Sequence, residues 1–233
     1  MTESRHRLII ALDASSAAAA RKIVAAVGDA GVFYKIGMQL YTAEGPALVR
    51  ELVQSGRRVF LDLKYHDIPN TVGAAVQEAA QLGVSMLTVH ASGGGRMLRA
   101  AVEAAGASSQ VPLVLGVTVL TSLEDGDLNM MGVRGNVVDQ VLRLAALALS
   151  NGCGGVVASA HEASALREDL GQDFALVTPG VRPVGSGRGD QARVVTPKEA
   201  IAAGASHIVV GRPITEAADP AAETRAILGE IGD

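Results

Sequence analysis

The sequence predicts an α/β protein of the (β/α)8 barrel class, folded as a single domain over residues 1–233. Three observations lead to this prediction. Short runs of β-branched and other apolar residues alternate with alanine-rich stretches of helical period, the alternation recurs along the whole chain, and no low-complexity tract or shift in composition interrupts it. A doubly wound open sheet is the alternative, because a count of strands does not by itself require closure.

The expected elements follow from these runs in order. We expect strands at residues 8–13, 33–37, 59–64, 86–91, 113–119, 155–159, 175–180 and 207–211. The first helix, within SSAAAARKIVAAVGDAG, is capped at its start by Ser15 or Ser16 and has Gly31 just past its end. A later helix, NTVGAAVQEAAQLG, starts at Asn70 after a proline and is closed by Gly83.

Two segments between the strands are expected to be less regular. HASGGGRML, after the fourth strand, should form a turn and the start of a helix. LEDGDLNMMGVRGN, residues 123–136, should form a loop or a short extra helix. We expect His66 and His90 to be hydrogen-bonded structural residues and Thr118 to pack within its strand.

The composition excludes several classes of partner. The formal charge is −4, there is no tryptophan, and aromatic residues make up 3%, so the chain lacks the basic face and the stacking platforms that nucleic-acid binding uses. Hydrophobic residues reach 48%, yet no run attains the roughly 18 uninterrupted apolar residues of a membrane span. We therefore expect a small-molecule ligand, and neither nucleic acid nor a membrane as a partner.

The N-terminal stretch and the cysteine content bear on location and metal binding. MTESRHRLIIALD lacks the pattern of a signal or transit peptide, so we expect a cytoplasmic protein. Cys153 is the single cysteine, which excludes an internal disulfide, and we expect it to be buried packing. No Cys and His cluster has zinc spacing, so no metal site is expected.

Charged residues fall on the predicted inner faces of the first three strands. Side chains alternate along a strand, so Asp62 and Lys64 share a face with Phe60 and point into the barrel at its C-terminal mouth, where catalytic groups of this fold lie. Asp13 and Lys35 have the same phase in the first two strands. Taken alone, an aspartate at the end of a strand is often a helix cap or turn residue, and a lysine there can extend its amine to solvent. Burying four charges together is costly unless they are paired and used, so we predict a functional site.

A segment rich in glycine and arginine follows the predicted seventh strand. TPGVRPVGSGRGDQARVVTP carries Arg182, Arg188 and Arg193, and VVGRPIT at the eighth strand adds Gly211 and Arg212. Glycines let backbone N–H groups close on an oxyanion, and arginine offers a bidentate fork. Phosphate sites of this barrel lie after strands seven and eight, so the sequence predicts phosphate binding here.

DLKYHDIPNT is the most distinctive motif of the chain. With ALD, YKIG, HASGG, VTVLTS, TPGVRP, DQARVVTP and GRPIT, it resembles the D-x-K-x-x-D-I-P-N-T signature and the motif order of the orotidine 5′-phosphate decarboxylase family over nearly the whole chain. The joint match is specific and departs at no motif position. A bare D-x-K-x-x-D is not specific, because related sugar-phosphate synthases and keto-gulonate phosphate decarboxylases carry it too.

The resemblance implies an enzyme that decarboxylates orotidine 5′-phosphate to UMP in de novo pyrimidine biosynthesis, with neither metal nor organic cofactor. Asp13 and Lys35 would bind the ribose hydroxyls. Asp62 would lie against the substrate carboxylate, and Lys64 would protonate the C6 vinyl carbanion of the pyrimidine. The catalytic residues implied are Lys35, Asp62, Lys64 and Asp67.

The same resemblance implies a homodimer whose active sites are shared across the interface. Asp67, with Ile68 and Thr71, would reach into the site of the partner subunit, and Thr121 would lie near the base. The residues implied to hold the phosphate end are Arg182, Gln191, Gly211 and Arg212.

Two alternative functions remain open. A related decarboxylase or aldolase on the same barrel would use the two aspartates to bind magnesium for an enediolate, although the DIPNT and DQARVVTP segments disfavour it. A non-catalytic sensor of a phosphoribosyl ligand is the second alternative. Lys64 between two carboxylates disfavours a sensor, because binding alone needs no proton donor there.

Overall fold

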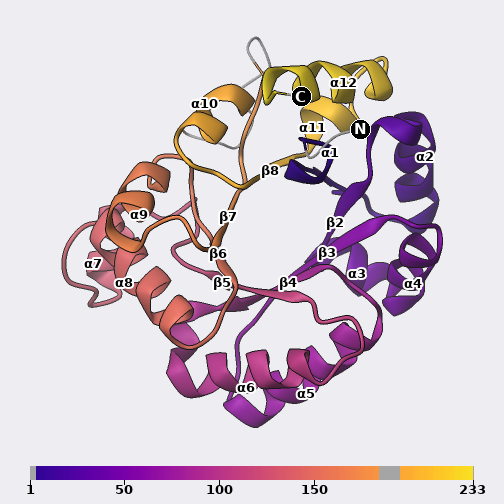
Figure 1. Cartoon of the computed structure of the whole chain (residues 1–233). Helices are drawn as coiled ribbons and strands as arrows, with labels where there is room; N and C mark the ends of the chain where they lie inside the picture. Colours follow the sequence, from indigo (N-terminus) through magenta and orange to yellow (C-terminus); the bar gives the residue numbers. More distant parts are fainter. Residues whose placement is uncertain (1–3, 184–194, 233) are drawn as a thin grey trace.

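The protein is a closed barrel of eight parallel strands surrounded by helices (Figure 1). The structure, a computed structural model, describes residues 4–183 and 195–232. Neighbouring strands pair in chain order from β1 to β8, and β8 pairs with β1. The predicted barrel is therefore confirmed, and the open-sheet alternative is wrong.

The strands correspond to the eight predicted ones. They are β1 (Leu8–Ala11), β2 (Phe33–Gly37), β3 (Arg58–Tyr65), β4 (Met86–His90), β5 (Leu113–Val117), β6 (Gly155–Val157), β7 (Ala175–Thr178) and β8 (His207–Val210). Most of them end one or two residues before the predicted end. Leu12, Thr118 and Ala158, directly beyond β1, β5 and β6, still donate backbone hydrogen bonds to the neighbouring strand. The chain then turns into the loops of the barrel mouth, because the assigned end of a strand can differ by one or two residues from the end of its pattern.

Helices follow the strands and cover the outside of the barrel (Figure 1). They are α1 (Ser4–Arg7), α2 (Ala17–Val27), α3 (Met38–Glu44), α4 (Pro46–Gln54), α5 (Pro69–Gln81), α6 (Gly94–Gly106), α7 (Asp125–Met130), α8 (Val137–Ser150), α9 (Ala163–Leu170), α10 (Pro197–Ala202), α11 (Arg212–Thr215) and α12 (Pro220–Glu230), with short 3-10 turns η1 (Gly28–Ala30) and η2 (Ala91–Gly93). Within the described ranges, no helix is long and apolar enough to cross a membrane.

The ends of two helices test the predicted caps. The N-cap of α2 is Ser16, one of the two predicted residues, and its side chain accepts a hydrogen bond from the backbone N–H of Ala19. The η1 turn separates α2 from Gly31, which therefore does not directly follow the α-helix. Helix α5 begins at Pro69, one residue before the predicted start, because proline is favoured in the first helical turn. Gly83 follows its last turn with φ 77°, as predicted.

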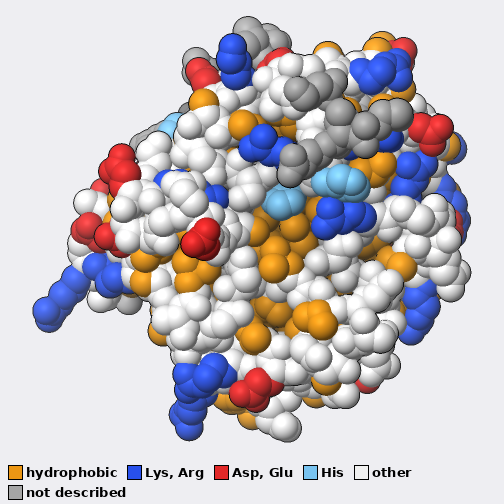
Figure 2. Space-filling view, in the orientation of Figure 1, with side chains coloured by type: hydrophobic (Ala, Val, Ile, Leu, Met, Phe, Trp, Pro, Cys, Tyr) orange, Lys and Arg blue, Asp and Glu red, His pale blue; other side chains and the backbone are white. Residues whose placement is uncertain are grey.

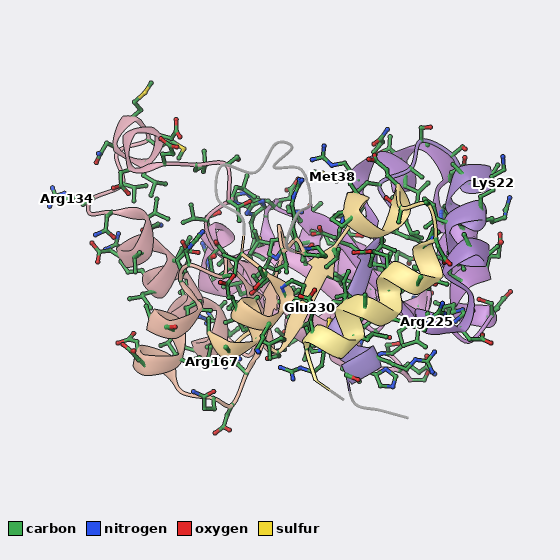
Figure 3. The ribbon with its side chains drawn as sticks, turned by 90° about the horizontal axis from the view of Figure 1, so that it is seen from above. Lys22, Met38, Arg134, Arg167, Arg225 and Glu230 are labelled. Atoms are coloured by element: carbon green, nitrogen blue, oxygen red, sulfur yellow. The ribbon has the colours of Figure 1, made fainter. Side chains whose placement is uncertain are left out.

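The less regular segments also have their predicted forms. HASGGGRML forms the η2 turn and the start of α6, and the segment 123–136 contains the short helix α7. Arg134, after α7, stands well away from the barrel wall (Figure 3). Cys153 is buried in the core between strands and helices, as predicted.

Two cores hold the barrel together. The barrel interior is filled by inward-facing strand residues, namely Ile9, Ala11, Phe33, Phe60, Met86, Leu115, Val177 and Val209. A larger core lies between the outer faces of the strands and the helices. The inner core fills the barrel below the site, so polar side chains near the C-terminal ends of the strands rest on a packed apolar floor.

Aromatic and cationic side chains close the N-terminal end of the barrel, where α1 lies. The guanidinium carbon of Arg58 lies 4.4 Å from the centre of the Phe33 ring, and the His207 ring meets the same ring edge-on at 6.3 Å. Figure 2 looks on to this end and shows histidine side chains beside lysine or arginine side chains near its centre. Burial and these positive charges lower the pKa of His207 to about 4.

Candidate active site

Four charged side chains form an alternating row at the C-terminal mouth of the barrel. The Nζ atom of Lys35 lies 3.5 Å from Oδ1 of Asp13 and 3.6 Å from Oδ2 of Asp62. The other carboxylate oxygen of Asp62, Oδ1, lies 2.8 Å from Nζ of Lys64. The prediction that these residues converge is confirmed, and we call Asp13, Lys35, Asp62 and Lys64 the charge row.

The first three strands hold the charge row in place. Asp13 follows β1, and Lys35 is central in β2, where it pairs with Ala11 and Phe60 on either side. The side chains of Lys35 and Asp62 are only 13% and 12% exposed, whereas that of Asp13 is 59% exposed. The centre of the row is therefore shielded from solvent, so its ion pairs are stronger than surface pairs.

Lys64 reaches Asp62 from an unusual backbone conformation. Its φ is 53°, and it is the only residue other than glycine with a positive φ in the described part of the chain. The side chains of Leu63 and Tyr65 pack against the core outside the barrel. The predicted alternation of side chains therefore holds, with Asp62 and Lys64 facing inward, whereas the left-handed backbone at Lys64 was not predicted.

A cavity of about 210 Å³ opens beside the charge row and is lined by all four of its members. The rest of its lining comes from Leu12, Gly37, Met38, Gln39 and Leu40. Gly37 is the last residue of β2, and the others follow β1 or β2 at the mouth of the barrel. The cavity thus presents charged and polar groups that can accept hydrogen bonds from a hydroxyl-bearing ligand and donate hydrogen bonds to it.

A second cavity of about 160 Å³ shares Lys35, Asp62 and Lys64 with the first. Its other walls are mainly apolar and consist of Phe60, Val117, Val119, Leu120, Thr121, Val157, Ala158, Pro179 and Val209. Thr121, which the resemblance places near the base, thus lines this cavity. Because the two cavities meet at the lysines, one ligand can place a polar portion in the first and a flat, less polar portion in the second.

The predicted residues after β3 lie outside both cavities. Asp67 accepts a hydrogen bond from the backbone N–H of Ile68, with a distance of 2.6 Å from Oδ1 to N. Ile68 is 66% exposed, and Thr71 is exposed in the first turn of α5. Among the described residues, none of these three lines a cavity at the charge row. Their side chains are therefore presented outward from their own barrel.

Two of the predicted phosphate residues lie at the end of β8. Gly211 precedes α11, and a Cβ atom added to it would lie 3.2 Å from Oδ2 of Asp13. Its backbone therefore passes directly beside one end of the charge row. Arg212 is the first residue of α11 and is exposed.

The segment after β7 brings Arg182 to the mouth. Arg182 is buried, and its backbone N–H donates to the carbonyl oxygen of Val195 at 3.0 Å. Val181 also forms a bridge with Val195, so the two ends of the glycine-rich segment are joined. Gln191, with Arg188 and Arg193, lies outside the described residues.

Three polar residues near the mouth have structural contacts. The rings of His66 and His90 lie 5.4 Å apart, and burial, followed by the charges of His66 and Lys64, lowers the pKa of His90. Thr118 donates a hydrogen bond to the carbonyl oxygen of Val157 at 2.8 Å. Across residues 4–183 and 195–232, no group of three or more His, Cys, Asp and Glu side chains could hold a metal ion.

The structure also reveals site residues that the sequence reasoning missed. Gly37, Met38 and Gln39 line the first cavity, and their position at the end of the strand of Lys35 or directly after it is the signal that could have identified them. Thr88 bonds both Asp62 and Lys64. It is a polar residue on the inner face of an otherwise apolar strand, which was a usable signal as well.

Comparisons with known proteins find relatives of this chain in one family. Residues 6–227 match the model of the family described as "Orotidine 5'-phosphate decarboxylase / HUMPS family". The orotidine 5′-phosphate decarboxylase of Idiomarina loihiensis is 50% identical over 227 residues, which cover 97% of this chain and 98% of that protein. That of Moorella thermoacetica is 49% identical over 98% of this chain and 93% of its own length.

A solved structure has the same fold and a similar sequence. The crystal structure of orotidine 5′-phosphate decarboxylase from Lactobacillus acidophilus has a TM-score of 0.88 and 42% sequence identity, and the match covers 97% of this chain and 99% of the other. An uncharacterized conserved protein from Geobacillus kaustophilus has a TM-score of 0.85 and 38% identity.

Proposed function

The chain belongs to the orotidine 5′-phosphate decarboxylase / HUMPS family, and from this premise we propose that its charge row promotes loss of the substrate carboxylate as CO2. Lys64 donates the proton that takes the place of the carboxylate. The reaction is the decarboxylation of orotidine 5′-phosphate, a carboxy-lyase reaction that yields UMP for pyrimidine biosynthesis. The observation that carries the proposal is the Asp62 carboxylate, which is bound to one lysine through each oxygen.

The chemistry requires such an arrangement of charges. Loss of CO2 from C6 of the pyrimidine leaves a vinyl carbanion with no carbonyl group placed to delocalise it. Stabilisation must therefore come from charges already fixed in position before the reaction. Asp62 holds the ammonium groups of Lys35 and Lys64 in the mouth of the barrel, so neither has to reorganise during the reaction.

Lys64 is the group that we assign as the proton donor. Its ammonium group attracts the developing carbanion and then transfers a proton to C6, which leaves a neutral amine and completes UMP. The supporting observation is that Lys64 lines both cavities, so it borders the space that a ligand spanning them would fill. General acid catalysis of this kind requires a donor within hydrogen-bond reach of the reacting atom.

Asp62 acts in two ways in this proposal. It orients Lys64, and it lies against the substrate carboxylate. Two like charges 4 Å apart repel by about 4 kcal/mol at an effective dielectric constant near 20. The repulsion is removed when the carboxylate leaves as neutral CO2, so it favours the reaction if remote contacts hold the substrate in place.

The remaining site residues supply those remote contacts. Asp13 and Lys35 bind the ribose hydroxyls in the first cavity, and Thr121 lies by the base in the second. The phosphate end is held by Arg182, Gln191, Gly211 and Arg212. The backbone of Gly211 beside Asp13 supports this assignment, because it joins the ribose end of the charge row to the start of α11. Binding energy from the phosphate thus helps to assemble the site.

We also assign Asp67, Ile68 and Thr71 to the site of a partner subunit in a homodimer. The supporting observations are their exposure and their position outside both cavities of their own chain. Pro69 begins α5 directly behind them and stiffens the turn that presents them. A carboxylate delivered in this way would lie on the far side of Lys64 from Asp62.

A decarboxylation assay on chelator-treated protein tests the proposed function. The protein is treated with EDTA, desalted, and mixed with orotidine 5′-phosphate, whose loss is followed by ultraviolet absorbance. We expect the same rate as for untreated protein, because both oxygens of Asp62 are already occupied by lysines. Activity that disappears and returns with magnesium would favour the enediolate alternative. Binding of the substrate without any turnover in either sample would favour a sensor.

A further inference from the structure

Thr88 lies beneath the charge row, between the two residues on which the proposed chemistry depends. It belongs to β4 and shares the inward phase of Met86, which fills the barrel interior. Its side chain is 0% exposed, so its hydroxyl needs partners within the protein. Among the described residues, Thr88 lines neither cavity, so we do not expect it to touch a substrate.

The pairing of β3 with β4 is irregular beside Thr88. Leu61 is opposite Leu87, and Tyr65 is opposite Val89, so three residues of β3 face Thr88 alone. A bulge of this kind removes backbone groups from the ladder, and those that are buried need other hydrogen-bond partners.

The Thr88 hydroxyl forms hydrogen bonds with Asp62 and Lys64, the two ends of this bulge. Its Oγ1 accepts a hydrogen bond from the backbone N–H of Lys64 at 2.9 Å. An N–H group can only donate, so the hydroxyl proton remains available, and Oγ1 donates it to Oδ1 of Asp62 at 3.1 Å. The same Oδ1 accepts from Nζ of Lys64 at 2.8 Å. One hydroxyl therefore contacts both the backbone of Lys64 and the carboxylate that orients its amine.

Lys64 needs such support because its backbone conformation is costly. A residue with a Cβ atom at φ 53° persists only where its surroundings hold it there. Threonine suits this task, since its β-branched side chain is stiff and keeps the hydroxyl in one direction.

We propose that Thr88 is a positioning residue for the reaction, which fixes Lys64 and Asp62 in their reactive arrangement through its two hydrogen bonds. The inference rests on the roles proposed above for Asp62 and Lys64. Thr88 acts through them, so its removal should affect turnover more than substrate binding, which depends on the distant phosphate contacts.

Two substitutions separate the hydroxyl from the rest of the side chain. Thr88→Val replaces the hydroxyl by a methyl group of similar shape, and Thr88→Ser keeps the hydroxyl. We expect Thr88→Val to lower kcat about 10- to 100-fold with KM changed less than about threefold, because a misplacement of about 1 Å costs up to about 100-fold. Thr88→Ser should keep at least about a third of the wild-type kcat. Wild-type turnover in Thr88→Val, or equal losses in both variants, would overturn the proposal.

Thr178→Val is the matched control. Thr178 is also 0% exposed, but within residues 4–183 and 195–232 its Oγ1 has no hydrogen-bond partner. It lies in β7 in phase with Leu176, which belongs to the core outside the barrel. The same exchange of a buried hydroxyl for a methyl group should leave kcat unchanged there. A loss equal to that of Thr88→Val would mean that the exchange itself is harmful, and would contradict a specific role for Thr88.

Crystal structures of the ligand-free wild type and Thr88→Val test the positioning without turnover. We expect the Nζ of Lys64 to move beyond about 4 Å from Asp62, out of ion-pair range, or the Lys64 backbone to leave its left-handed conformation. An unchanged Lys64 and Asp62 would refute the proposal, and Thr88→Ala gives the same comparison if Thr88→Val does not fold. If the wild type fails to decarboxylate orotidine 5′-phosphate, the proposed function fails, but these structures still decide the role of Thr88.

Discussion

The Nζ atom of Lys64 lies 2.8 Å from Oδ1 of Asp62, and the backbone that brings them together is left-handed at the lysine. The second oxygen of Asp62 faces Lys35 at 3.6 Å. One carboxylate thus holds two ammonium groups in the barrel mouth before a substrate arrives. Changes at this centre should act on turnover, whereas changes at the phosphate end should act mainly on the use of phosphorylated substrate.

Arg212→Ala should weaken the use of phosphorylated substrate. A charged hydrogen bond to phosphate contributes about 1.5–3 kcal/mol, so we expect kcat/KM for orotidine 5′-phosphate to fall roughly 10- to 100-fold. For orotidine, which lacks the phosphate, kcat/KM of Arg212→Ala should equal that of the wild type. Steady-state kinetics with both substrates make the comparison, and an equal loss for the two would remove Arg212 from the phosphate site.

Arg225→Ala is the control for this experiment. Arg225 is an exposed arginine on the outer helix α12 (Figure 3). Its removal changes the net charge by the same amount as Arg212→Ala does. We expect wild-type kcat/KM, since an exposed charge away from the mouth contributes little to ligand binding.

Mixing two inactive variants tests whether Asp67 acts in the partner's site. Subunits with Lys64→Ala and with Asp67→Ala should restore activity when mixed, because one site of each hybrid dimer receives an intact Lys64 from one chain and an intact Asp67 from the other. Random pairing makes about half of the dimers hybrid with one good site each, so we expect about a quarter of wild-type activity per subunit.

The control mixture pairs Lys64→Ala subunits with subunits that carry both substitutions. No hybrid site then contains Lys64, and the mixture should remain inactive. Native mass spectrometry shows whether subunits have exchanged. If exchange is complete and the first mixture stays inactive, each site is built within one chain and the assignment of Asp67 to the interface is wrong.

His207 should make the protein less stable in acid. Burial is the main reason that its pKa falls from 6.5 to about 4, followed by the positive charges of Arg58, Arg7 and His6. Above about pH 6.5 the residue is neutral in both states, but between pH 6.5 and 4 the unfolded chain binds a proton that the folded chain does not. The free energy of unfolding therefore decreases as the pH is lowered from 6.5 to 4, by at most about 3 kcal/mol.

His207→Gln removes this titration and should reduce the pH dependence of stability. Urea unfolding at pH 7 and pH 4.5 and at one protein concentration measures the difference, which we expect to be smaller in the variant by about 2 kcal/mol. His161→Gln serves as the control, because His161 is exposed. Equal pH dependence in the wild type and His207→Gln would show that His207 is protonated equally in the folded and unfolded states.

The fold and the charge row could be predicted because both depend on regular patterns. Alternation along a strand places Lys35 and Asp62 on the inner face, and a parallel barrel brings all C-terminal strand ends to one mouth. Neither step requires knowledge of side-chain contacts. Thr121, by contrast, was expected near the base only from the family resemblance.

The details of the charge row could not be predicted in this way. The left-handed backbone of Lys64 and its bond to Thr88 depend on the register of β3 against β4, which apolar runs do not encode. The ends of the strands depend on where neighbouring backbones diverge. The proposed place of Asp67 in a partner's site involves a second chain, and only the family resemblance indicated it.

The proton donor assignment is the central claim, and the turnover of Lys64→Ala tests it most directly. The substitution removes both the proton donor and the cation that faces the carbanion, while the proposed phosphate contacts remain. Lys22→Ala, at an exposed lysine on α2 (Figure 3), is the control and should keep wild-type kcat. We expect kcat of Lys64→Ala for orotidine 5′-phosphate to fall at least about 10⁴-fold. A purified, folded Lys64→Ala enzyme that retains about a tenth of the wild-type kcat would contradict the assignment.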